Sequence, residues 1–369
     1  FEATAVVREG RASPGQLWIS PDNVETFREL VTQTRAAAHG VFGSDHRVLL
    51  VLQLTHSGRY SRPDGTPRPV LVQHHPLLDR HPGSAEAGLL SDQQLDALQD
   101  DFVRAARLAA AAGFDAVDIK ACHGYLVGEL LAAFFREDSR YGGSFENRAR
   151  FVLEAVRRIA EEVPAVLVTS RMSLHDGIPR GFGGDAHDPP NELLAEPIEL
   201  ARGLQRLGCV MLSVSVGNPY INPHYGRPFD RPVAGVGVPD EHPLVGVSRL
   251  LRLTAAVQRA VPDLSVVGTG YSWLRQHFPN VGAGVLGSGG AALVGVGRLA
   301  LAYPDFARDL MTRGALDARK VCITCSGCSQ LMHAGRQAGC VVRDRELYRR
   351  RRADRPRGGG ADPPGSSKE

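Results

Sequence analysis

The chain has 369 residues, of which 43% are hydrophobic and 22% charged, and its formal net charge at pH 7 is +3. Such a composition is typical of a globular protein, and so small a charge gives no reason to expect a nucleic-acid partner. No apolar run reaches the roughly 18 residues that a membrane span needs, and the first residues do not resemble a secretory signal. We therefore expect a cytoplasmic protein that binds neither nucleic acid nor membranes.

Apolar runs and helical patterns alternate along most of the chain. The apolar runs that we expect to form strands are residues 1–7, 47–54, 114–121, 166–172, 209–216, 264–270 and 291–297. Helices are expected at residues 21–38, 91–112, 128–135, 146–162, 191–207, 248–261, 273–285 and 305–313. Strands that alternate with helices predict a parallel α/β fold, and the length suits one (β/α)8 TIM barrel with extensions. The number of predicted strands is one short of a closed barrel.

Changes in composition divide the chain into three segments. We expect residues 1–315 to form the barrel, and residues 316–348, which hold four of the six cysteines, to form a cysteine-rich segment. Residues 349–369 are rich in Arg, Pro and Gly and have no apolar face, so this tail is predicted to be disordered. A Pro- and Gly-rich loop at residues 217–246 is longer than a connection needs, which favours a lid or a substrate wall.

Polar residues gather at the end of the third predicted strand. Lys120, His123 and Tyr125 stand close together there, and each can donate a proton or a hydrogen bond. A (β/α) barrel keeps its chemistry at the carboxyl ends of its strands. Three such groups at one strand end therefore favour a catalytic site over simple packing beneath a loop.

Several motifs resemble those of the old yellow enzyme family of FMN-dependent oxidoreductases, in the branch related to 2,4-dienoyl-CoA reductase and trimethylamine dehydrogenase. The matching segments are Glu2-Ala3-Thr4, Gln53 to Arg59, His123-Gly124-Tyr125-Leu126, Arg140 to Arg148, and Gly297-Arg298. Together they span almost the whole chain. The chain departs from the family pattern at Lys120, where the family usually has a histidine. The resemblance also implies that the first strand of the barrel lies upstream of Phe1.

The predicted flavin contacts come from several strand ends. A phosphate needs backbone N–H donors and a cation, and barrels commonly bind it at their last two strands. Glycines that permit close backbone approach and an arginine fork stand there: Gly268, Gly270, Gly297 and Arg298. At the ends of two other strands, Gln53 and Arg171 would stabilise negative charge on the pyrimidine edge of the flavin, unless Arg171 pairs with Asp118 or Asp176. By resemblance, the backbone of Ala3 meets the flavin edge.

The resemblance implies hydride transfer between NAD(P)H, FMN and a small-molecule substrate whose oxygen is bound by His123 and Lys120. Tyr125 matches the proton donor of the family, which protonates one carbon while enolate charge is stabilised at the oxygen. Lys120 has three donors and a full charge, which favours a carboxylate or other acidic oxygen in the substrate over a simple enone. The alternative is that Asp118 neutralises Lys120 and the pair is structural.

Four cysteines near the end of the chain have the spacing of a metal site and not of a disulfide framework. They are Cys322, Cys325, Cys328 and Cys340. Three cysteines at this pitch with a distant fourth suit an iron–sulfur cluster, and the resemblance favours a 4Fe-4S cluster. Zinc bound by four thiolates and a vestigial site without a ligand are the alternatives. Because few residues follow the cysteines, electrons would come from NAD(P)H or from an electron-transfer partner.

Two other functions fit parts of the sequence. Lys120 at a strand end beside a phosphate site would suit a Schiff-base aldolase on the same barrel, although Gln53 and Arg171 argue against it. A non-catalytic subunit that has lost its flavin is the other alternative, and the missing first strand supports it. The sequence leaves open the substrate, the choice between NADH and NADPH, and a homo-oligomeric state.

Overall fold

The computed structural model describes residues 1–184, 194–231 and 237–349, so the predicted tail falls outside the described residues except for Arg349. Its sheet has seven parallel strands in chain order, with β1 and β7 at its edges. The strands are β1 (Thr4–Ala5), β2 (Val51–Thr55), β3 (Ala116–Ala121), β4 (Leu167–Ser173), β5 (Cys209–Ser215), β6 (Ser265–Gly268) and β7 (Leu293–Val294). This is the predicted (β/α) barrel arrangement with one strand fewer than a closed barrel.

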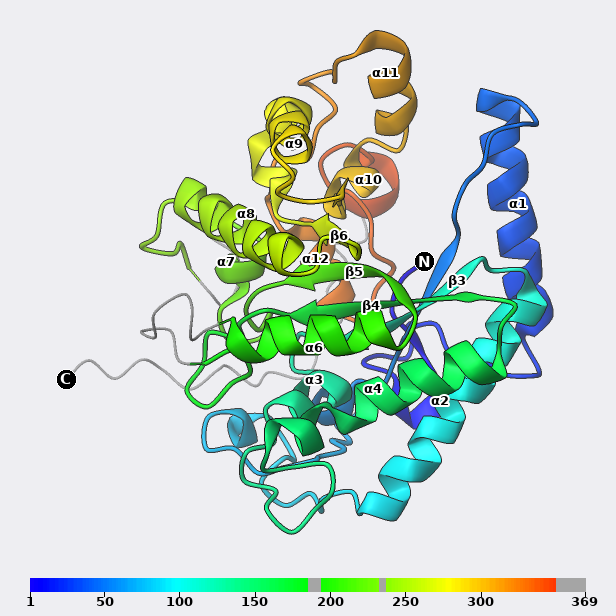
Figure 1. Cartoon of the computed structure of the whole chain (residues 1–369). Helices are drawn as coiled ribbons and strands as arrows, with labels where there is room; N and C mark the ends of the chain where they lie inside the picture. The colour runs from blue at the N-terminus through cyan, green and yellow to red at the C-terminus, as the bar shows by residue number, and fades with distance from the viewer. Residues whose placement is uncertain (185–193, 232–236, 350–369) are drawn as a thin grey trace.

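Helices alternate with the strands and also follow the last of them. They are α1 (Val24–Phe42), α2 (Asp92–Ala112), α3 (Leu126–Leu131), α4 (Phe145–Glu162), α6 (Ala195–Arg206), α7 (Pro223–Gly226), α8 (Pro243–Ala260), α9 (Phe278–Gly287), α10 (Arg298–Ala302), α11 (Phe306–Arg313) and α12 (Gly327–His333). Figure 1 shows α2, α4, α6 and α8 following one another around the sheet, and each packs against the next. Every helix in the described ranges is too short or too polar to cross a bilayer.

Helix α2 illustrates how local sequence sets these elements. Ser91 caps its start, because the Ser91 Oγ accepts a hydrogen bond from the Gln94 amide at 3.2 Å and the Gln94 side chain accepts one from the Ser91 amide at 2.8 Å. The helix ends at Gly113, whose φ of 89° suits glycine. Between these ends, Leu95 and Phe102 face the core and are fully buried. The predicted start and end of this helix are confirmed.

Several helices differ from their predicted bounds, and α1 is Val24–Phe42 where residues 21–38 were expected. The helix expected at 273–285 is a 3₁₀ helix, Tyr271–His277, followed by α9, and the break lies at Arg275 with its φ of 53°. Pro279 sits in the first turn of α9, where its missing N–H costs no hydrogen bond. The helix expected at 128–135 is α3 instead, and α8 begins at Pro243, five residues before the expected start. The proline again marks a first helical turn.

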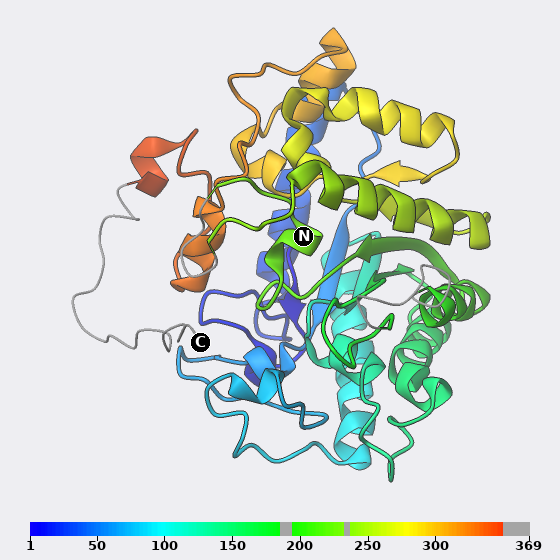
Figure 2. The same ribbon diagram turned by 90° about the vertical axis from the view of Figure 1, so that its left-hand side faces the viewer.

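Two hydrophobic clusters hold the fold together. The larger lies between the strands and the surrounding helices and includes Leu52, Ile119 and Leu212. The smaller joins Tyr271 to Leu299, Tyr303, Leu316 and Val321 beside β7. The start of the cysteine-rich segment is therefore packed onto the last helices of the barrel, and Figure 2 shows this segment in orange and red along one side of the molecule.

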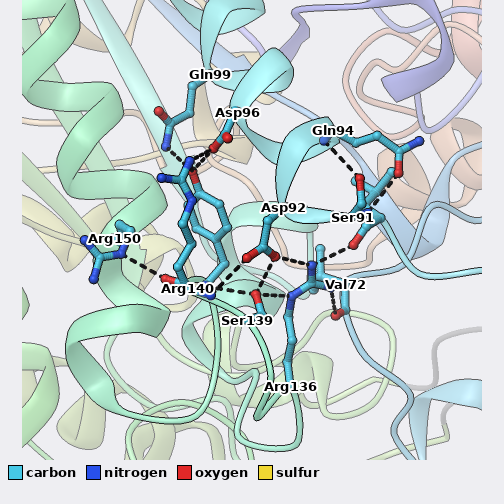
Figure 3. Close-up of polar contacts among 12 residues, drawn as sticks. Val72, Ser91, Asp92, Gln94, Asp96, Gln99, Arg136, Ser139, Arg140 and Arg150 are labelled. Atoms are coloured by element: carbon cyan, nitrogen blue, oxygen red, sulfur yellow. Dashed lines mark hydrogen bonds and ion pairs between the residues drawn. The ribbon is translucent and has the colours of Figure 1, made fainter.

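The loop between α3 and α4 is anchored to α2 by a polar network (Figure 3). The Asp92 carboxylate accepts hydrogen bonds from the Ser139 hydroxyl at 2.6 Å, the Arg140 amide at 3.0 Å and the Arg136 guanidinium at 2.8 Å. Next to it, the Tyr141 hydroxyl donates to Asp96. This part of the family-like motif at residues 140–148 therefore supports the fold, because its polar side chains hold the loop in place.

Candidate active site

A cavity of about 340 Å³ opens at the carboxyl ends of β4, β5, β6 and β7, a size suited to a small ligand. Five of the predicted site residues line it: His123, Arg171, Gly270, Gly297 and Arg298. The other predicted residues of the barrel are not among its lining residues: Ala3, Gln53, Lys120, Tyr125 and Gly268. The structure thus brings part of the predicted constellation together around one space.

Three guanidinium groups give this cavity its charge. Arg171, Arg227 and Arg298 all line it, and none of the three forms an ion pair within the described residues. Each also has a buried nitrogen without a hydrogen-bond partner: Nε of Arg171, Nε of Arg227 and Nη1 of Arg298. A buried hydrogen-bond donor without a partner is costly. The cavity is therefore suited to an anionic ligand.

The possible carboxylate partners of Arg171 are occupied elsewhere. Asp118 accepts hydrogen bonds from the Gln53 amide at 2.8 Å and the Thr169 hydroxyl at 3.0 Å. Asp176 accepts one from the Phe182 amide at 3.0 Å. The structural ion pair considered for Arg171 is absent from the described part of the chain. Gln53 is held in place by Asp118, beside the strand that carries Lys120.

Lys120 lies next to Arg171, because the two residues are in register on β3 and β4. Its ammonium stands 3.4 Å from the centroid of the Tyr125 ring, a cation–π contact. Burial, with Arg171 also nearby, lowers the pKa of Lys120 to about 8, although Cys122 and Asp118 act in the opposite direction. No ion pair joins Lys120 to Asp118 in the described residues, so the structural pair considered as the alternative is not formed there.

Tyrosines from two loops meet the end of β3. A side-chain hydrogen bond joins Tyr125 to Tyr220, and burial raises the pKa of Tyr125 well above its ordinary value. The Tyr220 ring stacks on Tyr60 with centroids 3.6 Å apart and planes at 12°. Asn218 gives a hydrogen bond to the Tyr60 hydroxyl. Tyr125 therefore sits in an aromatic wall, with its hydroxyl protonated near neutral pH.

His123 follows β3 in an uncommon backbone conformation. Its φ is 66°, which for a residue other than glycine is a mark of local strain. The ring Nε2 lies 2.7 Å from the Ser215 hydroxyl at the end of β5. Burial, with Arg171 and Lys120 nearby, holds the pKa of His123 well below its ordinary value. The imidazole is therefore neutral at pH 7, with one ring nitrogen that donates a hydrogen bond and one that accepts.

The predicted phosphate-binding glycines differ in the space around them. A Cβ on Gly268 would come within 2.8 Å of the Tyr271 hydroxyl, and one on Gly270, whose φ is 97°, within 2.4 Å of Leu250. At Gly297 a Cβ would meet nothing within 4 Å, so the backbone there is open to a ligand. Ala3 precedes β1, and its carbonyl accepts a hydrogen bond from Gln16 at 2.6 Å.

The four predicted metal ligands line one small pocket of about 20 Å³, together with Arg298 and Arg343. The sulfurs of Cys322 and Cys340 accept hydrogen bonds from the Thr324 and Arg343 amides, both at 3.4 Å. Across the described ranges, no three His, Cys, Asp or Glu side chains stand close enough to hold one metal ion.

The chain resembles known proteins both in sequence and in fold. The family model of the NADH:flavin oxidoreductase / NADH oxidase family matches residues 1–206, more than half of the chain. The chain belongs to this family. This match confirms the predicted relationship to flavin oxidoreductases. The barrel described above is the fold of this family member.

Each of the following relatives matches this chain over only part of both sequences. The chain is 27% identical over 238 residues to an NADH:flavin oxidoreductase of Gibberella zeae, which covers 58% of this chain and 54% of that protein. It is 29% identical over 218 residues to an NADPH dehydrogenase of Geobacillus sp., covering 58% and 57%. The chain thus spans about half the length of the curated relatives it matches. A solved complex of 2-naphthoyl-CoA reductase shares the fold at a TM-score of 0.70 and 20% identity, covering 93% of this chain and 49% of that one.

Sequence reasoning missed three residues of the site. Arg227 lines the cavity from the loop after α7, and Tyr60 and Tyr220 form the aromatic wall. Tyr60 directly follows the family-like segment that ends at Arg59, and Tyr220 and Arg227 lie in the long loop predicted to be a lid or wall. The length of that loop was the available signal, but it did not show which side chains face the cavity.

Proposed function

We propose that this chain is an FMN-dependent oxidoreductase that uses NAD(P)H to reduce a small, anionic, unsaturated substrate. The observation that carries the proposal is the cavity with three guanidinium groups that have no ion-pair partner in the described residues. FMN brings a phosphate and a ring that becomes negatively charged, so both ends of the cofactor fit this charge. When bound, FMN would supply hydride transfer between the nicotinamide and the substrate.

The residues of the last two strand ends would hold the phosphate. The open backbone at Gly297 and the left-handed turn at Gly270 allow close approach, and Arg298 would form paired hydrogen bonds with phosphate oxygens. Gly268, the last residue of β6, would also offer its backbone to the phosphate. Arg171 would stabilise negative charge at the pyrimidine edge. Its neighbours there would be Gln53 and the backbone of Ala3.

On the substrate side, Lys120 and His123 would bind the oxygen next to the reacting carbon. A full positive charge at Lys120 and a neutral imidazole at His123 favour an oxygen on which negative charge develops. Tyr125 would give its proton to the other carbon, because its hydroxyl is protonated at neutral pH and has a hydrogen-bond partner in Tyr220. An acidic substrate oxygen would also neutralise the buried ammonium of Lys120.

The cysteine pocket would hold a 4Fe-4S cluster as a second redox group. All four cysteines line it, and thiolates around a cluster lie farther apart than thiolates around one ion. The cluster would connect the barrel, residues 1–315, to an electron-transfer partner through residues 316–348. Arg298 lines both the cavity and this pocket, so the flavin and the cluster would be neighbours under this proposal.

The decisive experiment compares flavin content in the anaerobically purified protein and in Arg298→Ala. The proposal expects noncovalent FMN in the wild type, identified by its visible spectrum and by release on denaturation. Arg298→Ala should lose most of the flavin while its circular dichroism stays unchanged. Arg252, exposed on α8 and without a role in the cavity, provides the matched control Arg252→Ala. Equal flavin content in both variants would contradict the assignment of the phosphate site.

A Schiff-base aldolase is the second candidate, because Lys120 is buried and its pKa of about 8 would leave a useful fraction of neutral amine. Such an enzyme would form an imine between Lys120 and a carbonyl substrate, and borohydride would reduce this imine to a stable adduct. Mass spectrometry of borohydride-treated protein distinguishes the two functions. An adduct on Lys120 in a flavin-free protein would favour the aldolase.

A further inference from the structure

Two arginines of the cavity come from distant parts of the chain. Arg298 begins α10, directly after β7, and Arg227 follows α7. Burial, with Arg298 as the nearby like charge, lowers the pKa of Arg227 to about 10, whereas Cys328 acts in the opposite direction. Two cations that share one cavity destabilise each other unless an anion lies between them. One arginine is enough for a simple phosphate contact, so the second requires an explanation.

Arg227 is also held from the side of the cysteine-rich segment. Its Nη1 donates a hydrogen bond to the Ser329 hydroxyl at 2.6 Å, across 102 positions of the sequence. Ser329 lies on α12, directly after Cys328. The Nε of Arg227 remains buried without a partner, as does Nη1 of Arg298. One edge of the Arg227 guanidinium is thus fixed, while another donor has no acceptor.

We propose that Arg227 is a second ligand of the flavin phosphate and that Ser329 positions it, so that the cysteine-rich segment takes part in flavin binding. This inference rests on the proposed binding of FMN. A phosphate dianion between Arg227 and Arg298 would neutralise the paired charges and accept hydrogen bonds from both guanidinium groups. Riboflavin, which has the same ring system without the phosphate, would gain nothing from this contact.

The test uses that difference between the two flavins. The full-length protein is stripped of flavin, and the affinities for FMN and riboflavin are measured by quenching of flavin fluorescence. In Arg227→Ala the FMN affinity should fall about tenfold to a hundredfold, as expected for the loss of a hydrogen-bonded charge. The riboflavin affinity should stay within about twofold, which also shows that the variant is folded. Arg227→Lys should recover part of the loss, and Arg252→Ala, the exposed control, should match the wild type.

Ser329→Ala tests the positioning role separately. As a single substitution it should weaken FMN binding by about threefold to tenfold. Added to Arg227→Ala it should have no further effect, because the two residues act as one unit. A fall in iron and sulfide content in Arg227→Ala with an unchanged FMN-to-riboflavin affinity ratio would overturn the inference, since Arg227 would then serve the cysteine pocket. If Arg298→Ala loses FMN and Arg227→Ala does not, the proposed function stands and this inference fails. Failure of the wild type to bind either flavin would overturn both.

Discussion

The Lys120 ammonium lies 3.4 Å from the centroid of the Tyr125 ring, at the end of β3. Lys120 stands where the family pattern that this chain resembles usually has a histidine. The contact joins a cation that would bind the substrate oxygen to a tyrosine that would give the proton. Asp118 accepts hydrogen bonds from Gln53 and Thr169, and it forms no ion pair with Lys120 in the described part of the chain.

The first prediction concerns the charge of Lys120. In Lys120→His, kcat/KM for anionic unsaturated substrates should fall at least tenfold, and kcat/KM for simple enones should rise, because the full charge is replaced by a neutral donor. Steady-state kinetics on matched pairs of acids and their neutral esters or ketones provide the measurement. If the variant keeps its turnover of the acids within about threefold, less than ~1 kcal/mol of barrier, Lys120 has no special role.

The second prediction is a pH dependence. The folded-state pKa of Lys120 is lowered to about 8, so the ammonium is charged below this pH and loses its charge as the pH rises through it. For an anionic substrate, kcat/KM should therefore be level below pH 8 and decrease above it, approaching a tenfold decrease for each pH unit. Lys120→Arg, whose guanidinium stays charged, should abolish this decrease. A profile of the variant that still decreases near pH 8 would assign the titration to another group.

The third prediction separates hydride transfer from proton transfer. In Tyr125→Phe, reduction of the flavin by NAD(P)H should proceed at the wild-type rate, whereas reoxidation by the unsaturated substrate should slow by about 10²- to 10⁴-fold, as for loss of a general acid. Stopped-flow absorbance resolves these two half-reactions. Tyr60→Phe is the matched control, because Tyr60 contacts Tyr220 by stacking and its hydroxyl bonds to Asn218. Equal slowing in both variants would indicate that loss of any hydroxyl in the aromatic wall slows the reaction, and that Tyr125 is not the specific proton donor.

The fourth prediction concerns the network of Figure 3. Asp92→Ala removes the acceptor shared by Ser139, Arg136 and the Arg140 amide, so the free energy of unfolding should fall by about 1–3 kcal/mol. Urea unfolding followed by circular dichroism measures it. Asp100→Ala on the same helix is the control: its carboxylate is 67% exposed and pairs with Arg158, and an exposed pair contributes at most about 1 kcal/mol. An equal effect of the two changes would show that the network adds no stability.

The fifth prediction concerns the cysteine pocket. Cys340→Ala should remove most of the iron and acid-labile sulfide from anaerobically purified protein, because a cluster normally needs its fourth thiolate. Metal analysis by mass spectrometry and a sulfide assay provide the measurements. Cys209→Ala is the control, since Cys209 is buried at the start of β5, far along the chain from the pocket. Zinc in the wild type would refute the cluster, and iron that is unchanged in Cys340→Ala would refute Cys340 as its ligand.

Local patterns were sufficient for the scaffold of this protein. Apolar runs and capping residues are short-range signals, so the seven strands and the bounds of α2 followed from the sequence alone. The strand-end residues Arg171 and Arg298 could also be placed at one face, because parallel strands of a barrel all end there. Both residues line one cavity, as expected from the order of the strands along the chain.

Tertiary structure alone decided which side chains complete the site and which pairs form. Asp118 and Lys120 share one face of β3, but whether they pair depends on Gln53 and Thr169 from the neighbouring strands, which bind the carboxylate first. Arg227 reaches the cavity because the loop after α7 packs against α12, a contact between residues 102 positions apart. Such contacts depend on long-range packing of loops, for which a single sequence has no periodic signal.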